Sequence, residues 1–193
     1  MSKIYCILGK SSVGKDSLLN ILEVNGFKRV ISHTSRPMRS TELNGREYHF
    51  VDVNHMMDMI QNNEFIERRT YKVVGDTVWY YGIHKKEIDI NGNDDYIVIV
   101  DAQGFQAIKD YYGDENVMGI YMYIDNRERL LRALNRCKVT DKDVDEIVRR
   151  YQSDDIDFTK DIIDECTLKI NNINLNQSAD IVIRNVKGKC RKI

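Results

Sequence analysis

The sequence predicts an α/β fold in which a parallel β-sheet carries helices on both faces. Four short apolar runs have the composition of buried strands, at residues 4–8, 97–100, 118–124 and 181–183. The first three are each followed by a segment with the apolar spacing of a helix. Near-continuous apolar runs suit strands buried on both faces, and their alternation with helices favours parallel pairing.

Length and composition limit the function classes. A chain of 193 residues suits one compact domain, and its 29 Lys and Arg nearly balance its 30 Asp and Glu. We therefore expect no bulk attraction to nucleic acid or to an anionic membrane. No apolar run approaches the roughly 18 residues of a membrane span, and residues 4–8 are too few for a signal peptide, so a cytoplasmic location is expected. The four cysteines are far apart and are expected to be reduced, at Cys6, Cys137, Cys166 and Cys190.

Residues 9–15 read Gly-Lys-Ser-Ser-Val-Gly-Lys, between the strand at 4–8 and a helix whose apolar stripe closes at Gly26. This context makes the match to a phosphate-binding loop strong. The two glycines let backbone N–H groups point inward, and Lys15 supplies a cation for β and γ phosphates. The residues predicted to bind ATP here are Gly9, Ser11, Ser12, Val13, Gly14, Lys15, Asp16 and Ser17.

The residue after Lys15 is Asp16, whereas most such loops have a Ser or Thr whose hydroxyl binds Mg²⁺. Ser17 follows. The interpretation is that Asp16 either faces away or holds Mg²⁺ through water. Ser17 then supports the α-phosphate, and phosphate oxygens and water hold most of the metal.

Residues 33–95 differ from the rest of the chain, with short alternating stretches and a small helix after Asn54, and they are expected to form a β-rich insertion. Arg36 and Arg39 can fork a monophosphate, and Tyr48 can donate its hydroxyl to the same oxygens. Glu67 can accept two N–H donors side by side, which guanine presents at N1 and N2 and adenine does not. The alternative is that these are surface charges.

Three stretches together, 32–39, 42–50 and 63–67, resemble the guanylate kinase family. The family carries two arginines three apart, a glycine turn, Tyr-x-Phe and the ending Asn-Glu-Phe-Ile-Glu. The resemblance implies guanine contacts from Ser32 and Glu67, and GMP-phosphate contacts from Arg36, Arg39, Tyr48 and Tyr81. Two features depart from the family: Ile83 stands where a Ser or Thr is common, and an extra hairpin tip is expected at 73–78.

The strand at 96–100 ends in Asp101-Ala-Gln-Gly, which is similar to the family's D-x-D-x-Q-G with Ile99 in place of the first aspartate. Asp101 is expected to hold a metal-bound water or the guanine amino group, or else to be a simple helix N-cap. Residues 126–151 are expected to form two helices around a charged turn. The resemblance places the family's lid arginines at Arg132, Arg136 and Arg150, and a solvated charged helix is the alternative.

Residues 179–185 resemble the family's last core strand and the asparagine that borders the adenine pocket, here Asn185. The family continues with a further helix, whereas this chain ends soon after, at Ile193. The adenine end is therefore expected to be either simplified or completed by a neighbouring subunit, as in a homodimer.

As a whole, the resemblance implies one domain over 1–193 with a P-loop NTPase-type core at 1–32, 96–125 and 152–193. The nucleotide-monophosphate-binding insertion is 33–95 and the helical lid is 126–151. It implies ATP-dependent phosphorylation of GMP, or dGMP, with Mg²⁺ as cofactor held through water by Ser17 and Asp101. The implied catalytic residues are Lys15, Arg39, Arg132, Arg136 and Arg150.

Two other functions stay open at the level of sequence. The Gly-Lys-Asp-Ser loop ending also looks like that of kinases for ribose 1,5-bisphosphate or for other deoxynucleoside monophosphates. A non-catalytic guanylate-kinase-like binding module is the second alternative, although such modules tend to lose the phosphate lysine or lid arginines that this chain retains.

Overall fold

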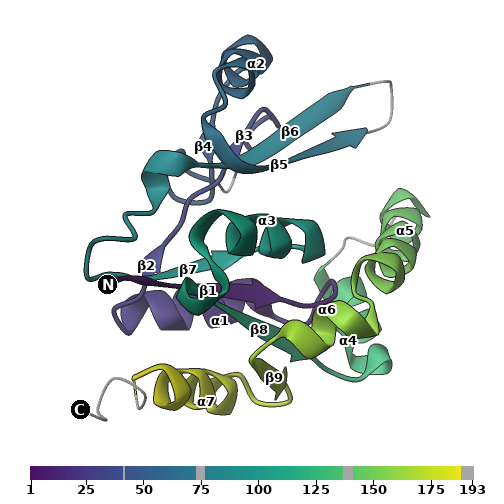
Figure 1. The fold of residues 1–193 in the computed structure, drawn as a ribbon. Helices are drawn as coiled ribbons and strands as arrows, with labels where there is room; N and C mark the ends of the chain where they lie inside the picture. The colour runs from purple at the N-terminus through teal and green to yellow at the C-terminus, as the bar shows by residue number, and fades with distance from the viewer. Residues whose placement is uncertain (41, 73–76, 137–140, 188–193) are drawn as a thin grey trace.

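The computed structural model describes residues 1–40, 42–72, 77–136 and 141–187. Its larger sheet is parallel throughout, with strand order β2-β7-β1-β8-β9 (Figure 1). The strands are β1 (Lys3–Leu8), β2 (Lys28–Arg29), β7 (Asp95–Ile99), β8 (Val117–Tyr123) and β9 (Leu168–Asn171). The α/β fold class and the first three predicted strands are confirmed.

Helices cover both faces of this sheet, with α3 above it and α1 and α7 below it in Figure 1. Side chains of β1 alternate between the two faces: Ile4 shares a core with Phe105 of α3, whereas Ile7 shares one with Leu18 of α1 and Val182 of α7. A strand buried on both faces needs the continuous apolar run that the sequence has here. The helices are α1 (Lys15–Val24), α3 (Ala102–Tyr112), α6 (Lys160–Glu165) and α7 (Leu175–Lys187).

A second, four-stranded sheet lies above α3 in Figure 1, with strand order β4-β3-β6-β5. Its strands β5 and β6 form a long antiparallel hairpin, and α2 packs Met56 and Met59 against Phe65. The extra hairpin tip was predicted at 73–78, and residues 73–76 of it lie outside the described residues. The elements are β3 (His33–Thr34), β4 (His49–Phe50), α2 (Val53–Gln61), β5 (Phe65–Lys72), β6 (Val78–His84) and the short 3-10 helix η1 (Lys85–Glu87).

The predicted pair of lid helices is present as α4 (Asn126–Arg136) and α5 (Asp141–Asp157). Helix α5 continues past the expected end at 151, which brings Asp154 and Asp155 back to the loop after β1. Residues 138–140 of the expected charged turn lie outside the described residues. A second 3-10 helix, η2 (Asp114–Asn116), precedes β8.

The predicted strand at 181–183 is wrong, because these residues lie inside α7. Ala179, Val182 and Val186 are buried against the sheet, whereas Ile181 is 45% exposed. This spacing of three and four residues is that of one helix face. The last strand of the sheet is β9, where buried Ile170 pairs with Met122 of β8.

No helix in the described part of the chain is long and apolar enough to cross a bilayer. Cys6 and Cys166 are free and buried, as expected of incidental thiols. Burial raises the pKa of Cys6, and it raises the pKa of Cys166 to about 11. Cys137 and Cys190 lie outside the described residues.

Candidate active site

The loop between β1 and α1 has the conformation that its two glycines predict. Gly9 has φ 144° and Gly14 has φ 100°, both in the region that favours glycine. A Cβ at Gly9 would lie 2.4 Å from the Met122 carbonyl oxygen, and one at Gly14 would lie 2.6 Å from Nδ2 of Asn172. Ser12 also has positive φ, at 64°. The loop is therefore curled tightly against β8 and the residue after β9.

Lys15 folds back over this loop. Its Nζ donates to the Gly9 carbonyl oxygen at 2.6 Å and to the Lys10 carbonyl oxygen at 3.0 Å. Burial lowers the pKa of Lys15 to about 8, helped by the charges of Arg129 and Arg136 and opposed by Asp154 and Asp16. The ammonium thus lies at the start of α1, where backbone N–H groups and the helix dipole also favour an anion.

A buried ion pair that the sequence did not reveal holds the outer side of the loop. Asp154 of α5 accepts from the Ser11 N–H at 2.8 Å and from the Ser11 hydroxyl at 3.2 Å. Arg129 of α4 donates to the same carboxylate at 2.6 Å and to the Ser11 carbonyl oxygen at 3.0 Å. The guanidinium lies 4.2 Å from the centre of the Tyr151 ring. Both lid helices are therefore fixed to the phosphate loop by charged hydrogen bonds.

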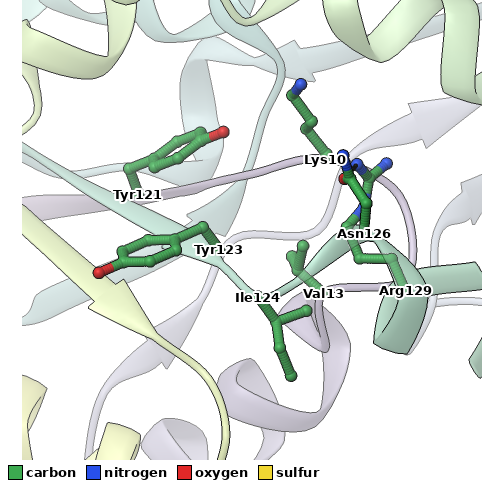
Figure 2. Close-up of a pocket in the computed structure, with 7 residues that line it drawn as sticks. All are labelled: Lys10, Val13, Tyr121, Tyr123, Ile124, Asn126 and Arg129. Atoms are coloured by element: carbon green, nitrogen blue, oxygen red, sulfur yellow. Dashed lines mark hydrogen bonds between the residues drawn. The ribbon is translucent and has the colours of Figure 1, made fainter.

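A cavity of about 140 Å³ adjoins the loop on this side (Figure 2). The rings of Tyr121 and Tyr123 lie along one wall, and Lys10 and Arg129 lie across from them. Lys10 is itself paired with Asp155. The cavity continues the loop surface but is small, so it does not by itself accommodate a nucleotide.

Of the predicted lid arginines, Arg132 is placed at the phosphate loop. Arg132 donates to the Val13 carbonyl oxygen at 3.4 Å and to the Asn172 carbonyl oxygen at 3.2 Å. Arg136 is exposed at the end of α4, and its charge contributes to the lowered pKa of Lys15. Arg150 is 53% exposed and pairs with Glu146 one turn earlier on α5, at 2.7 Å. The structure therefore does not bring Arg150 to the loop.

Asn185 does not occupy the position expected of it. It lies on an exposed part of α7 and donates to the Ile181 carbonyl oxygen at 2.8 Å, within its own helix. The asparagine that follows the last core strand is Asn172, directly after β9: its Nδ2 donates to the Val13 carbonyl oxygen at 2.7 Å and its Oδ1 accepts from Ser178 at 2.8 Å. In the sequence, the alternating apolar residues Leu168 and Ile170 shortly before Asn172 were the signal that could have indicated this strand and its asparagine.

The second sheet gathers the predicted phosphate-acceptor residues. Arg36 lies 5.5 Å from the centre of the Tyr48 ring, and the Tyr48 and Tyr81 rings are 5.7 Å apart. Arg36 is buried and makes a two-pronged pair with Glu42, at 2.7 and 3.0 Å. The same Glu42 accepts from the backbone N–H of Arg39 at 2.8 Å. The side chain of Arg39 is exposed. The sequence predicted the arginines and tyrosines of this cluster, but it did not reveal that Glu42 pairs with Arg36.

Two of the predicted base contacts, Glu67 and Asp101, are joined by Arg69, and their carboxylates are already paired. Glu67 is 5% exposed, and both of its oxygens accept from Arg69, at 3.1 and 3.2 Å. Arg69 also donates to Oδ2 of Asp101 at 3.0 Å. Burial raises the pKa of Glu67 and the guanidinium opposes this, while the two carboxylates raise the pKa of Arg69 and keep it charged. Ser32 is half-buried, and its carbonyl oxygen accepts from the His49 N–H at 2.9 Å.

Asp101 caps α3, with Oδ1 accepting from the Gly104 N–H at 2.8 Å. Both of its oxygens thus have donors, which suits a helix cap better than a metal ligand. Among the residues that the structure describes, no group of three or more His, Cys, Asp or Glu is placed to hold a metal ion. Ser17 lies half-buried in the first turn of α1, and Asp16 beside it is exposed.

Electrostatic interactions connect the three parts of the site. The Asp16 charge is among the influences that raise the pKa of Tyr48, after burial and Tyr81. Tyr71 of β5 likewise contributes to the raised pKa of Arg149 on α5. In Figure 1 the β5–β6 hairpin of the second sheet lies above α3 and extends toward α5.

Comparisons with known proteins agree with this arrangement. A family model described as guanylate kinase matches residues 1–177. The guanylate kinase of Porphyromonas gingivalis is 34% identical over 142 residues, which are 70% of this chain and 72% of that protein. The guanylate kinase of Chromohalobacter salexigens is 32% identical over 131 residues, which are 66% of this chain and 58% of that protein.

A solved structure of guanylate kinase from Anaplasma phagocytophilum is similar in fold, with a TM-score of 0.66 over 98% of this chain and 87% of that chain at 20% identity. The phosphate loop, the acceptor cluster and the match of the family model over residues 1–177 lead to one conclusion. This chain belongs to the guanylate kinase family.

Proposed function

We propose that this chain transfers the γ-phosphoryl group of ATP to the phosphate of GMP, giving ADP and GDP. The observation that supports this most directly is the presence of two groups of residues suited to phosphate: a phosphate loop curled around Lys15 and, on the second sheet, a separate cluster of Arg36, Tyr48 and Tyr81. Two phosphate-binding groups in one molecule suit a reaction between two phosphorylated substrates. The division into a core, an acceptor-binding insertion at 33–95 and a lid at 126–151 belongs to the same proposal.

In this reaction an oxygen of the GMP phosphate attacks the γ-phosphorus in line. That oxygen is already anionic near neutral pH, so no general base is needed, and catalysis rests on positioning and charge stabilisation. Lys15 meets the transferring end of ATP, and Arg39 and Arg136, both exposed, are free to turn toward it. Arg132 and Asn172 are proposed to border the nucleoside end of ATP, because both contact Val13 of the loop. Arg150 acts only if the lid rearranges and its pair with Glu146 opens.

Mg²⁺ belongs to the proposal as cofactor, and Ser17 is the protein ligand that suits it. Mg²⁺ commonly keeps several waters and binds substrate phosphates, so one nearby hydroxyl is sufficient. When bound, it neutralises charge on the β and γ phosphates. Asp101 fits a metal less well, because both of its oxygens already accept hydrogen bonds.

Three further expectations stay predictions: a homodimer, the absence of a nucleic-acid partner and a cytoplasmic location. The neighbouring subunit was expected because the family has a further helix after its last core strand. Helix α7 follows β9 within this chain, and sedimentation velocity tests the dimer directly.

A coupled assay of ADP formation with ATP and each acceptor tests the function. We expect turnover to depend on GMP, with dGMP also accepted. Turnover with ribose 1,5-bisphosphate and none with GMP would favour the sugar-phosphate alternative. Absence of turnover with every acceptor, despite nucleotide binding, would favour a binding module.

A further inference from the structure

The base end of the proposed acceptor site is closed by one residue of this chain, Arg69. Its guanidinium donates to both oxygens of Glu67, at 3.1 and 3.2 Å, and to Oδ2 of Asp101, at 3.0 Å. Counting side-chain atoms alone, Arg69 is 18% exposed, Glu67 is 2% exposed and Asp101 is 25% exposed. Bridging two carboxylates in a largely buried setting uses the fork geometry of arginine, which lysine cannot reproduce.

The strand places Arg69 there through simple alternation. Residues 67 and 69 of β5 share one face, while Arg68 between them points to the other face and is exposed. Across the hairpin, Glu67 pairs with Ile83, which is fully buried. Arg69 pairs with Tyr81 of the acceptor cluster.

Guanine presents N–H donors at N1 and N2, and these need carboxylate or hydroxyl acceptors. Both Glu67 oxygens and one Asp101 oxygen already accept from Arg69, and the remaining Asp101 oxygen caps α3. Ile83 and the half-buried Ile99 offer no side-chain acceptor. A guanine at this end of the acceptor site therefore meets carboxylates whose charge is already paired, and its two N–H donors compete with the Arg69 guanidinium for Glu67.

We propose that Arg69 is a specificity-determining residue that pairs with the base-reading carboxylates, so that GMP competes with it for them and guanine is selected only weakly. The inference rests on the proposed function for the identity of the acceptor. It predicts that GMP and IMP, which lacks the 2-amino donor, bind with similar affinity. Removing the guanidinium frees Glu67 and restores discrimination.

Isothermal titration of GMP and IMP without ATP tests this on the full chain. We expect Arg69→Met to bind GMP at least about tenfold more tightly than the wild type, because hydrogen bonds to a freed carboxylate are strong. IMP, with one donor fewer, gains less. The control is Arg68→Met on the opposite face of the same strand, which should leave both affinities unchanged.

An unchanged or weaker GMP affinity in folded Arg69→Met overturns the inference, as does strong preference for GMP over IMP in the wild type. If Arg69→Met does not fold, Arg69→Lys decides in its place, because it keeps the charge but cannot bridge both carboxylates; its GMP affinity should also rise, and no rise contradicts the proposal. Binding needs no turnover, so a chain that binds GMP as expected but never phosphorylates it would refute the proposed function alone.

Discussion

Lys15 is the residue on which the proposed chemistry depends most. Its ammonium is held by two loop carbonyl oxygens at the start of α1, at the point where the β and γ phosphates of ATP are expected to bind. Replacing those carbonyl contacts with phosphate contacts requires only a small movement of a flexible side chain. The loop is thus prepared for phosphate before the nucleotide arrives.

Lys15→Ala should lower turnover with ATP and GMP by roughly two to three orders of magnitude, since it removes a charge aimed at the transferring group. GMP binding should survive, because the acceptor cluster lies on the second sheet. Steady-state kinetics and GMP titration measure the two effects. Lys10→Ala, on the same loop, is the control and should lose far less; equal losses would argue against a special role for Lys15.

ATP affinity should fall as the pH rises through about 8, the lowered pKa of Lys15. Below this pH the free protein carries the ammonium that attracts phosphate, and above it the amine is neutral. The terminal phosphate of ATP loses its last proton at a pKa of about 6 to 7, and any further ionisation above pH 7 would strengthen rather than weaken its attraction to the site. The predicted fall in affinity therefore reports the protein group. Titrations between pH 7 and 9 measure it, and Lys15→Arg, which stays charged, should flatten the profile.

At this scale the sequence predicts residues whose role follows from local spacing. Gly9, Gly14 and Lys15 were readable because the loop motif specifies their backbone and charge. Arg69 and Asp154 were not, since their partners lie on other elements and only the fold brings them together. The signal for Arg69 was its position two residues after Glu67 on a strand, which places both on one face.

Among the elements, α5 is linked directly to the phosphate loop through Asp154, which accepts hydrogen bonds from Ser11. This carboxylate is 8% exposed and pairs with Arg129, which is 2% exposed, so the pair is almost wholly buried. Removing one partner of such a pair leaves the other charge uncompensated.

Asp154→Ala should therefore lower the free energy of unfolding by about 3 kcal/mol. It should also weaken ATP binding, because Ser11 loses its anchor. The neighbouring Asp155→Ala is a matched control on the exposed side of α5 and should leave stability unchanged within error. Denaturant melts of both variants decide the matter, and equal stabilities would contradict the role given to Asp154.

The second sheet has its own pH dependence through His33. Burial and the nearby His49 and His84 lower the pKa of His33 to about 4, against about 6.5 for an unfolded chain. The unfolded state therefore binds a proton that the folded state does not, and this contribution to stability is present above pH 6.5 and lost as the pH falls toward 4. His33→Phe should lose less stability than the wild type over this pH range. Denaturant melts of the wild type and the variant between pH 7 and 4 measure the difference, and a parallel decline of the two free energies of unfolding would contradict the role given to His33.

Helix α7 shows why one predicted element was wrong. A run of three apolar residues at 181–183 fits a buried strand or a buried helix turn equally well in sequence. The decision rests on packing against α1 and on the residues before and after the run, where Ala179 and Val186 complete a helix face. Strands that are apolar throughout, such as 4–8, left no such ambiguity.

For the whole molecule, the second sheet is joined to the core by the hydrogen bond that Arg69 of β5 donates to Asp101, directly before α3. Helix α3 lies between the two sheets in Figure 1. The sequence predicted the phosphate loop, the acceptor residues and the lid arginines as separate motifs in chain order. Their arrangement in space depends on long-range packing around α3, which motif spacing does not encode.

The most direct test of the central claim is the stoichiometry of nucleotide conversion by the purified chain. With ATP, GMP and Mg²⁺, we predict one GDP for each ADP formed, resolved by chromatography, and loss of both products in Lys15→Ala. ADP formation that is independent of GMP, or GDP formation that persists undiminished in Lys15→Ala, would contradict it.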